Sequence, residues 1–106
     1  MCRLYTCDVT ENAMREKDIE QRLVQAVKRM GGIAPKFVSP GLDGVPDRII
    51  LLPGGRIAFA ELKAPGEQPR PLQSARISQL RNLGFPVYLI DGSNMIGGIL
   101  DEISAT

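Results

Sequence analysis

The chain of 106 residues predicts an α/β layer sandwich built on a mixed sheet. Three observations support this prediction: a helical stripe of apolar residues, a hairpin signal in the middle of the chain, and a second helix followed by an apolar strand. In chain order they give helix, strand, two hairpin strands, helix and strand. A composition with 43% apolar and 24% charged residues suits one globular domain.

The first helix is predicted over residues 16–30, and two glycines at 31–32 end it. Its apolar stripe consists of Ile19, Leu23, Ala26, Val27 and Met30. Glu20 lies on the rim of this stripe, and Glu16 lies one turn earlier on the same side. Acids in a first helical turn also interact favourably with the helix dipole, so both can be ordinary solvated residues. The residues before this helix show no period. We therefore expect an N-terminal extension at 1–13 and a single domain at 14–106.

A short first strand is predicted over residues 33–38, followed by a loop at 39–45 that is rich in proline and glycine. Lys36 within this strand can reach a phosphate or project into solvent. After the loop, Pro46 leads directly into Asp47 and an apolar run.

The hairpin is predicted over residues 48–52 and 56–63, because Pro-Gly-Gly separates two apolar runs. If residues 53–55 form the loop, counting back places Asp47 opposite Glu61. Directly opposed residues share a face, with Cβ atoms about 5 Å apart. Lys63 lies two residues beyond Glu61 and points to the same face.

Two carboxylates held this close repel each other unless a cation lies between them. Oxygen ligands of this kind suit Mg²⁺ or Mn²⁺. The alternative is a cross-strand salt bridge of Lys63 with its acidic neighbours on a solvated face. Because Ile57 and Phe59 share the face of Glu61, that face should be at least half buried. Buried paired carboxylates without a cation are costly, so the metal site is as well supported as the salt bridge at this point.

The second helix is predicted over residues 71–83, with proline at its first position and Gly84 at its C-terminal end. Its inner stripe consists of Leu72, Ile77, Leu80 and Leu83. Gln73 and Arg76 also fall inside this stripe. A glutamine there needs a partner, most commonly a backbone group of the preceding loop. A last strand is predicted at 85–90. The apolar segment 95–103 is then either a small helix covering the sheet or part of a dimer contact.

Charge and residue usage limit the chemistry further. Between residues 15 and 81 there are twelve Lys or Arg and seven Asp or Glu, a surplus that fits a phosphate-backbone partner or a mixed-charge surface. The sequence has no histidine, so acid–base chemistry must use carboxylates, lysine or metal-bound water. Cys2 and Cys7 are interpreted as incidental. No apolar run approaches a membrane span, and the cytoplasm is the expected compartment.

The residues also carry a resemblance. Pro46-Asp47 followed by Glu61-Leu62-Lys63 resembles the PD-(D/E)XK nuclease signature, which alone is a weak motif. The longer ordered set is more specific and resembles the VRR-NUC family, best its short stand-alone phage and bacterial members. This set consists of residues 36–41, 44–48, 53–56, 61–66 and 71–73. The resemblance covers roughly residues 16–91 and implies a restriction-endonuclease-like fold.

The resemblance implies a metal-dependent DNA endonuclease in which Asp47, Glu61 and the Leu62 carbonyl bind Mg²⁺ or Mn²⁺. Related nucleases also use a glutamate of the first helix, for which Glu20 matches better than Glu16. Lys63 would orient the attacking water and stabilise the transition state, and Gln73 would lie beside the active site.

Further positions follow from the same resemblance. Lys36, Arg48 and Arg76 are candidates for contacts with the DNA backbone. Short family members are expected to form homodimers and to cleave branched DNA such as four-way junctions, in the host cytoplasm if the protein is phage-encoded. The main alternative is a non-catalytic DNA-binding module of the same fold. A third possibility is a scaffold whose carboxylates only bridge strands.

Overall fold

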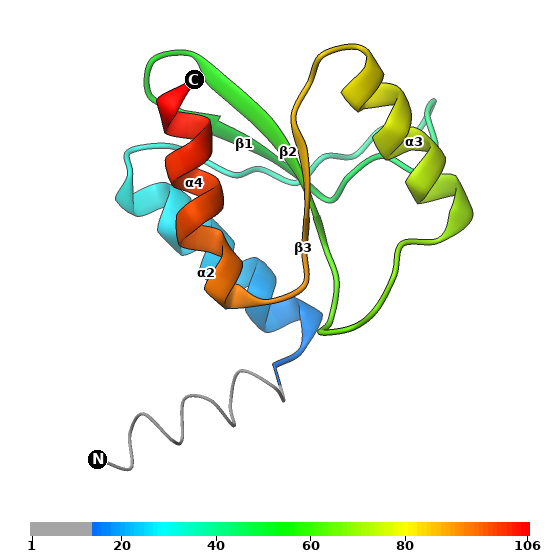
Figure 1. Cartoon of the computed structure of the whole chain (residues 1–106), viewed down its shortest axis with the longest axis horizontal. Helices are drawn as coiled ribbons and strands as arrows, with labels where there is room; N and C mark the ends of the chain where they lie inside the picture. Colours follow the sequence, from blue (N-terminus) through cyan, green and yellow to red (C-terminus); the bar gives the residue numbers. More distant parts are fainter. Residues whose placement is uncertain (1–13) are drawn as a thin grey trace.

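A computed structural model describes residues 14–106 of the chain (Figure 1). The predicted extension at 1–13, with both cysteines, lies outside the described residues. The elements in chain order are helix α2 (Glu16–Arg29), strand β1 (Arg48–Leu52), strand β2 (Arg56–Leu62), helix α3 (Pro71–Asn82), strand β3 (Val87–Ile90), the 3₁₀ helix η1 (Ser93–Met95) and helix α4 (Ile96–Ala105). No helix within residues 14–106 is both long and apolar enough to cross a membrane.

The three strands form a mixed sheet, as predicted, and their order in the sheet is β1-β2-β3. Strands β1 and β2 are antiparallel, and β3 lies parallel to β2. Leu52 pairs with Arg56 and Arg48 with Ala60, which is the register counted from a loop at 53–55. In that loop Gly54 and Gly55 have φ angles of 89° and 75°, a conformation that glycine adopts at little cost. The turn sequence therefore fixes which residues of the two strands oppose each other.

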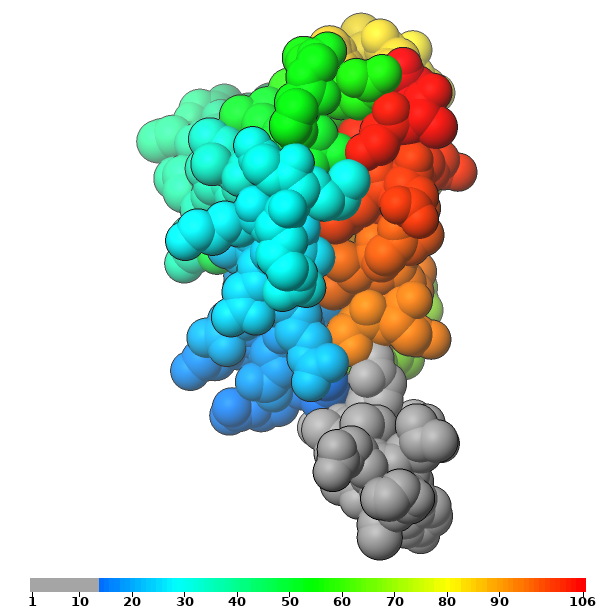
Figure 2. Space-filling view, turned by 90° about the vertical axis from the view of Figure 1, so that its left-hand side faces the viewer, coloured from blue at the N-terminus to red at the C-terminus, as the bar shows by residue number. Residues whose placement is uncertain are grey.

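The layers of the sandwich are unequal. Helices α2 and α4 cover one face of the sheet, and α3 lies on the other side (Figure 1). Figure 2 shows α2 and α4 side by side at the surface. The main core lies under this pair and includes Ile19, Leu23, Val27, Ile50, Ala58, Ala60, Ile90, Leu100 and Ile103. The alanines of β2 let both helices approach the sheet closely. The segment predicted at 95–103 is thus a helix that covers the sheet.

A smaller core on the other face holds α3. It consists of Phe59, Ile77 and Val87, with Phe37, Ile49 and Leu80 packed against it. The predicted inner stripe of this helix is wrong at both ends, because Leu72 is 51% and Leu83 66% exposed. Ile77 is the one buried residue of α3. The helix therefore contacts the sheet through its middle, and its first turn faces the space next to Asp47.

The predicted strand at 33–38 is also wrong as a regular element. Only two isolated bridges join it antiparallel to β1, Ile33 with Leu51 and Lys36 with Arg48. Pro35 lies between them and has no N–H to donate, although its carbonyl accepts a bond from the Ile49 N–H at 3.0 Å. The segment therefore runs beside β1 without forming a regular fourth strand.

Candidate active site

The structure brings Asp47, Glu61 and Lys63 together at one edge of the sheet, where β1 begins and β2 ends. Continuing the register by one residue beyond the Arg48–Ala60 pair places Asp47 level with Glu61. Asp47 Oδ2 accepts a hydrogen bond from the backbone N–H of Leu62 at 2.9 Å. Lys63 Nζ lies 3.5 Å from Glu61 Oε2. The hairpin geometry thus gathers two carboxylates, one ammonium group and the Leu62 backbone.

Glu61 is the most unusual residue of this group, because only 1% of it is exposed. Its Oε2 accepts a hydrogen bond from Gln73 Nε2 at 2.8 Å. Its Oε1 is buried and has no hydrogen-bond partner among residues 14–106. Burial raises the pKa of Glu61 from its ordinary 4.5 to about 7, and repulsion from Asp47 adds to the rise while Lys63 opposes it.

The pKa of Asp47 is also raised, for similar reasons. Burial raises the pKa of Asp47, and the Leu62 N–H counteracts that rise by bonding to the charged form. Among the charged neighbours of Asp47, Glu20 contributes most to the rise in pKa. A divalent cation between Asp47 and Glu61 would offset the repulsion between these two carboxylates and give the free Oε1 of Glu61 a partner. The donors are all oxygens, the set that Mg²⁺ and Mn²⁺ prefer.

Gln73 reaches this site from the first turn of α3. Pro71 starts the helix with a fixed φ and without a lost donor. Gln73 Oε1 accepts a hydrogen bond from the Arg70 backbone N–H at 2.9 Å, while its Nε2 donates to Glu61. The backbone bond and the contact with the site, weighed as alternatives from the sequence, occur together.

The glutamates of α2 approach from the opposite face of the sheet. Arg48 follows Asp47 and points the other way, where its Nε donates to Glu20 Oε2 at 2.7 Å. Its guanidinium also donates to the Ala34 carbonyl at 2.8 Å. Burial and then Asp47 raise the pKa of Glu16, and Lys63 lowers it. Both glutamates are thus electrostatically coupled to Asp47, but only Glu20 is held by an arginine.

The described residues contain no group of three or more acidic, cysteine or histidine side chains gathered closely enough to enclose a metal ion. Arg48 holds one oxygen of Glu20, and Gln73 and Lys63 hold one oxygen of Glu61. A metal ion bound by Asp47 and Glu61 would therefore take its remaining ligands from backbone carbonyls, water or a substrate oxygen.

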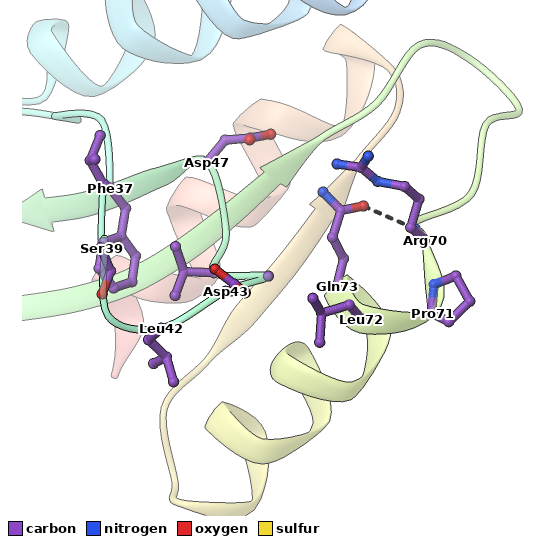
Figure 3. A pocket seen from close by; sticks show the side chains of 12 residues that line it. Phe37, Ser39, Leu42, Asp43, Asp47, Arg70, Pro71, Leu72 and Gln73 are labelled. Carbon is purple, nitrogen blue, oxygen red and sulfur yellow. Dashed lines mark hydrogen bonds between the residues drawn. The ribbon is translucent and has the colours of Figure 1, made fainter.

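The predicted DNA contacts divide into two kinds. Lys36 is exposed and lines a groove of about 680 Å³ together with residues of α2. Arg48 and Arg76 instead have partners within the protein, since Arg76 Nε donates to the Asp43 carbonyl at 2.8 Å. One cation was missed from the sequence: Figure 3 shows the guanidinium of Arg70 directed toward the same space as Asp47 and Gln73. Its position immediately before Pro71 and close to Gln73 was the available signal.

Comparisons with known proteins agree with this geometry. No family model matches the chain. The chain is 50% identical over 82 residues to a protein of Acyrthosiphon pisum secondary endosymbiont phage 1 named "Putative nuclease p44", covering 77% of this chain and 88% of the relative. A solved structure described as a VRR_NUC domain matches with a TM-score of 0.76 at 24% identity, covering 81% of this chain and 94% of the other. Given this relative, the chain belongs to the same nuclease family as that phage protein, and its fold is that of a VRR_NUC domain.

Proposed function

We propose that the protein is a Mg²⁺- or Mn²⁺-dependent DNA endonuclease that hydrolyses phosphodiester bonds and selects branched DNA. The observation that supports this most directly is the state of Glu61. It is buried against Asp47 with its Oε1 unpartnered, and its pKa is raised to about 7. A purely structural pair of this kind destabilises the fold, whereas a cation site uses the same arrangement.

Asp47, Glu61 and the Leu62 carbonyl would hold the metal, with Glu20, one oxygen of which is held by Arg48, acting on it through a bridging water. The bound ion supplies acidity to a coordinated water and polarises the phosphate. Glu20 is favoured over Glu16 because it is the charged neighbour with the largest effect on the pKa of Asp47. Arg48 keeps the Glu20 carboxylate in place from the α2 side.

Lys63 and Gln73 act on the substrate side. The ammonium of Lys63, 3.5 Å from Glu61, is positioned to donate a hydrogen bond to a phosphate oxygen or to the attacking water. Gln73 fixes Glu61 Oε2 with its amide and is itself held by the Arg70 backbone. Because the Gln73 amide is hydrogen-bonded on both its oxygen and its nitrogen, it keeps the Glu61 carboxylate oriented while charge develops on the phosphate.

DNA shape rather than base sequence is the proposed determinant of selectivity. Phe59 packs against both Phe37 and Phe85, with ring centroids 5.5 and 6.2 Å apart, so the three rings do not form a row on which successive bases could stack. Lys36 and Arg70 supply exposed cations for the DNA backbone, which position DNA without reading its sequence. A homodimer with two such sites would suit the two symmetric strands of a four-way junction.

The test is cleavage of labelled linear duplex, flap and four-way junction with Mg²⁺, Mn²⁺ or EDTA. Wild type is expected to cleave only with metal and to prefer the junction, and Lys63→Ala is expected to be inactive. The matched control is Lys28→Ala, which removes an exposed lysine in the last turn of α2, outside the groove of Lys36, and should stay active. Metal-loaded, folded wild type that binds but cleaves none of these substrates would instead identify a DNA-binding module.

A further inference from the structure

A pocket of about 640 Å³ opens directly beside the candidate active site. It lies between the loop at 39–45 and the first turn of α3 (Figure 3). Asp47 and Gln73 belong to its lining, so the pocket and the carboxylate site share a boundary. A volume of this size is typical of sites for organic ligands. The function proposed above uses Asp47 and Gln73 and leaves the rest of this pocket unexplained.

The loop that forms one wall is fastened to α3 at two points. Arg76 Nε donates to the Asp43 carbonyl at 2.8 Å. Gly44 has a φ of 79°, and a Cβ built on it would lie 2.8 Å from the carbonyl oxygen of Leu72. No larger residue allows this approach without a backbone shift. The loop and the helix therefore form a defined cleft.

The lining of this cleft is mixed, and its apolar side chains are open to solvent. Val38 is 76%, Leu72 51% and Leu42 40% exposed, although each lines the pocket. Phe37 also lines it, and its ring is supported from behind by Phe59 with ring centroids 5.5 Å apart. An aromatic ring held in place, bordered by aliphatic side chains, suits a flat apolar group such as a nucleobase.

The charge at the mouth of the cleft favours the same ligand class. Arg70 is exposed, and its guanidinium is directed toward the mouth beside Asp47 and Gln73 (Figure 3). A ligand that combines a base with a phosphate would place its base among the apolar walls and its phosphate between Arg70 and Lys63. A protein segment without a phosphate would leave Arg70 unmatched.

We propose that this cleft holds one unpaired nucleotide next to the phosphate that is cleaved. The inference rests on the proposed nuclease function and gives its selectivity for branched DNA a physical basis. A base inside a continuous duplex is paired and covered by its stacking neighbours on both sides, so taking it out costs the most. A nucleotide in a bulge is unpaired and one at the branch point of a junction has lost stacking on one side, so less energy is needed to extrude it into the cleft. Leu42 and Leu72 cover the faces of the inserted base.

The experiment measures DNA binding in a Lys63→Ala background with Mg²⁺, so that the DNA stays intact. Affinities for a duplex with a one-nucleotide bulge and for the perfectly paired duplex are compared by fluorescence anisotropy. The test variant adds Leu42→Ser and Leu72→Ser, and each single substitution is also made. The control adds Leu83→Ser, an equally polar change at a 66% exposed leucine outside the pocket. Thermal unfolding verifies that every variant is folded.

The Lys63→Ala protein, the parent of the other variants, is expected to bind the bulged duplex more tightly than the perfectly paired duplex. The double substitution should reduce this preference about tenfold, the scale of one lost base contact, and Leu83→Ser should leave it unchanged. A 2-aminopurine in the bulge should change fluorescence on binding to the parent and to the Leu83→Ser control, but not to the double variant. The inference is overturned if the parent shows no preference, if the preference survives the double substitution, or if that substitution converts a dimer to a monomer. Selective binding without cleavage by wild type would refute the nuclease function and leave the cleft assignment intact.

Discussion

Replacement of Glu61 by glutamine should stabilise the metal-free protein. Glu61 is 1% exposed, and its burial beside Asp47 raises its pKa from 4.5 to about 7. Above pH 7 the carboxylate is charged in both the folded and the unfolded chain, so the folded state bears the full cost of the buried charge. Glutamine keeps the size of the side chain and an oxygen that can accept the bond from Gln73, but removes the charge.

The rise in the pKa of Glu61 determines how large the gain in stability should be. A pKa that is higher in the folded than in the unfolded state means that folding takes up a proton between pH 4.5 and 7. Wild-type stability therefore falls as pH rises through this window and is level above it. At about 1.4 kcal/mol per pH unit, the difference from 4.5 to 7 amounts to about 3 kcal/mol. Glu61→Gln should recover up to that amount at pH 8 and nothing at pH 4.

Urea unfolding in EDTA at pH 4, 6 and 8 measures this difference. The control is Glu67→Gln in the exposed loop after β2, which should change stability by less than about 0.5 kcal/mol at every pH. A Glu61→Gln protein that is no more stable than wild type at pH 8, or whose advantage is independent of pH, would refute the reasoning.

Three further predictions concern the loop beside α3, the metal site and the DNA contact. Gly44→Ala should lower the free energy of unfolding by about 3 kcal/mol in urea titration, because it combines a positive φ with a clash against the backbone. Gly66→Ala, at a φ of 82° with open space around it, should lower it by only about 1 kcal/mol. Equal losses of stability would contradict the close approach of the loop to α3. Glu20→Gln should weaken Mn²⁺ binding at least tenfold by calorimetry and Glu16→Gln by less than about twofold, and the reverse order would make Glu16 the ligand. Lys36→Gln should weaken binding of all DNA substrates and reduce the slope of log affinity against log salt by about 1, and an unchanged slope would exclude a phosphate contact.

The core of the candidate site could be predicted because local rules determine it. The turn at 53–55 fixes the strand register, and the register places Asp47 level with Glu61. Alternation along β2 then brings Lys63 to the same face. Proline at the start of α3 sets the phase of the helix, which brings Gln73 to Glu61. These inferences use short sequence distances and turn chemistry.

The remaining features depend on tertiary partners that no local pattern specifies. The spacing of Leu72 and Leu83 is helical, but both are exposed because α3 touches the sheet only through its middle. Arg48, whose predicted DNA contact stays a prediction, bonds Glu20, 28 positions earlier in the chain. Arg76 bonds the Asp43 carbonyl across the cleft. Such pairings follow from how the layers pack, which the sequence pattern leaves open.

The central claim is that Asp47 and Glu61 together form a divalent cation site. Its most direct test is isothermal titration of Mn²⁺ into wild type, Asp47→Asn and Glu61→Gln at pH 8, without DNA. The account predicts saturable binding to wild type and its loss in each variant, while both variants remain folded by circular dichroism. Equal Mn²⁺ affinity in wild type and Glu61→Gln, or no binding to folded wild type, would contradict it.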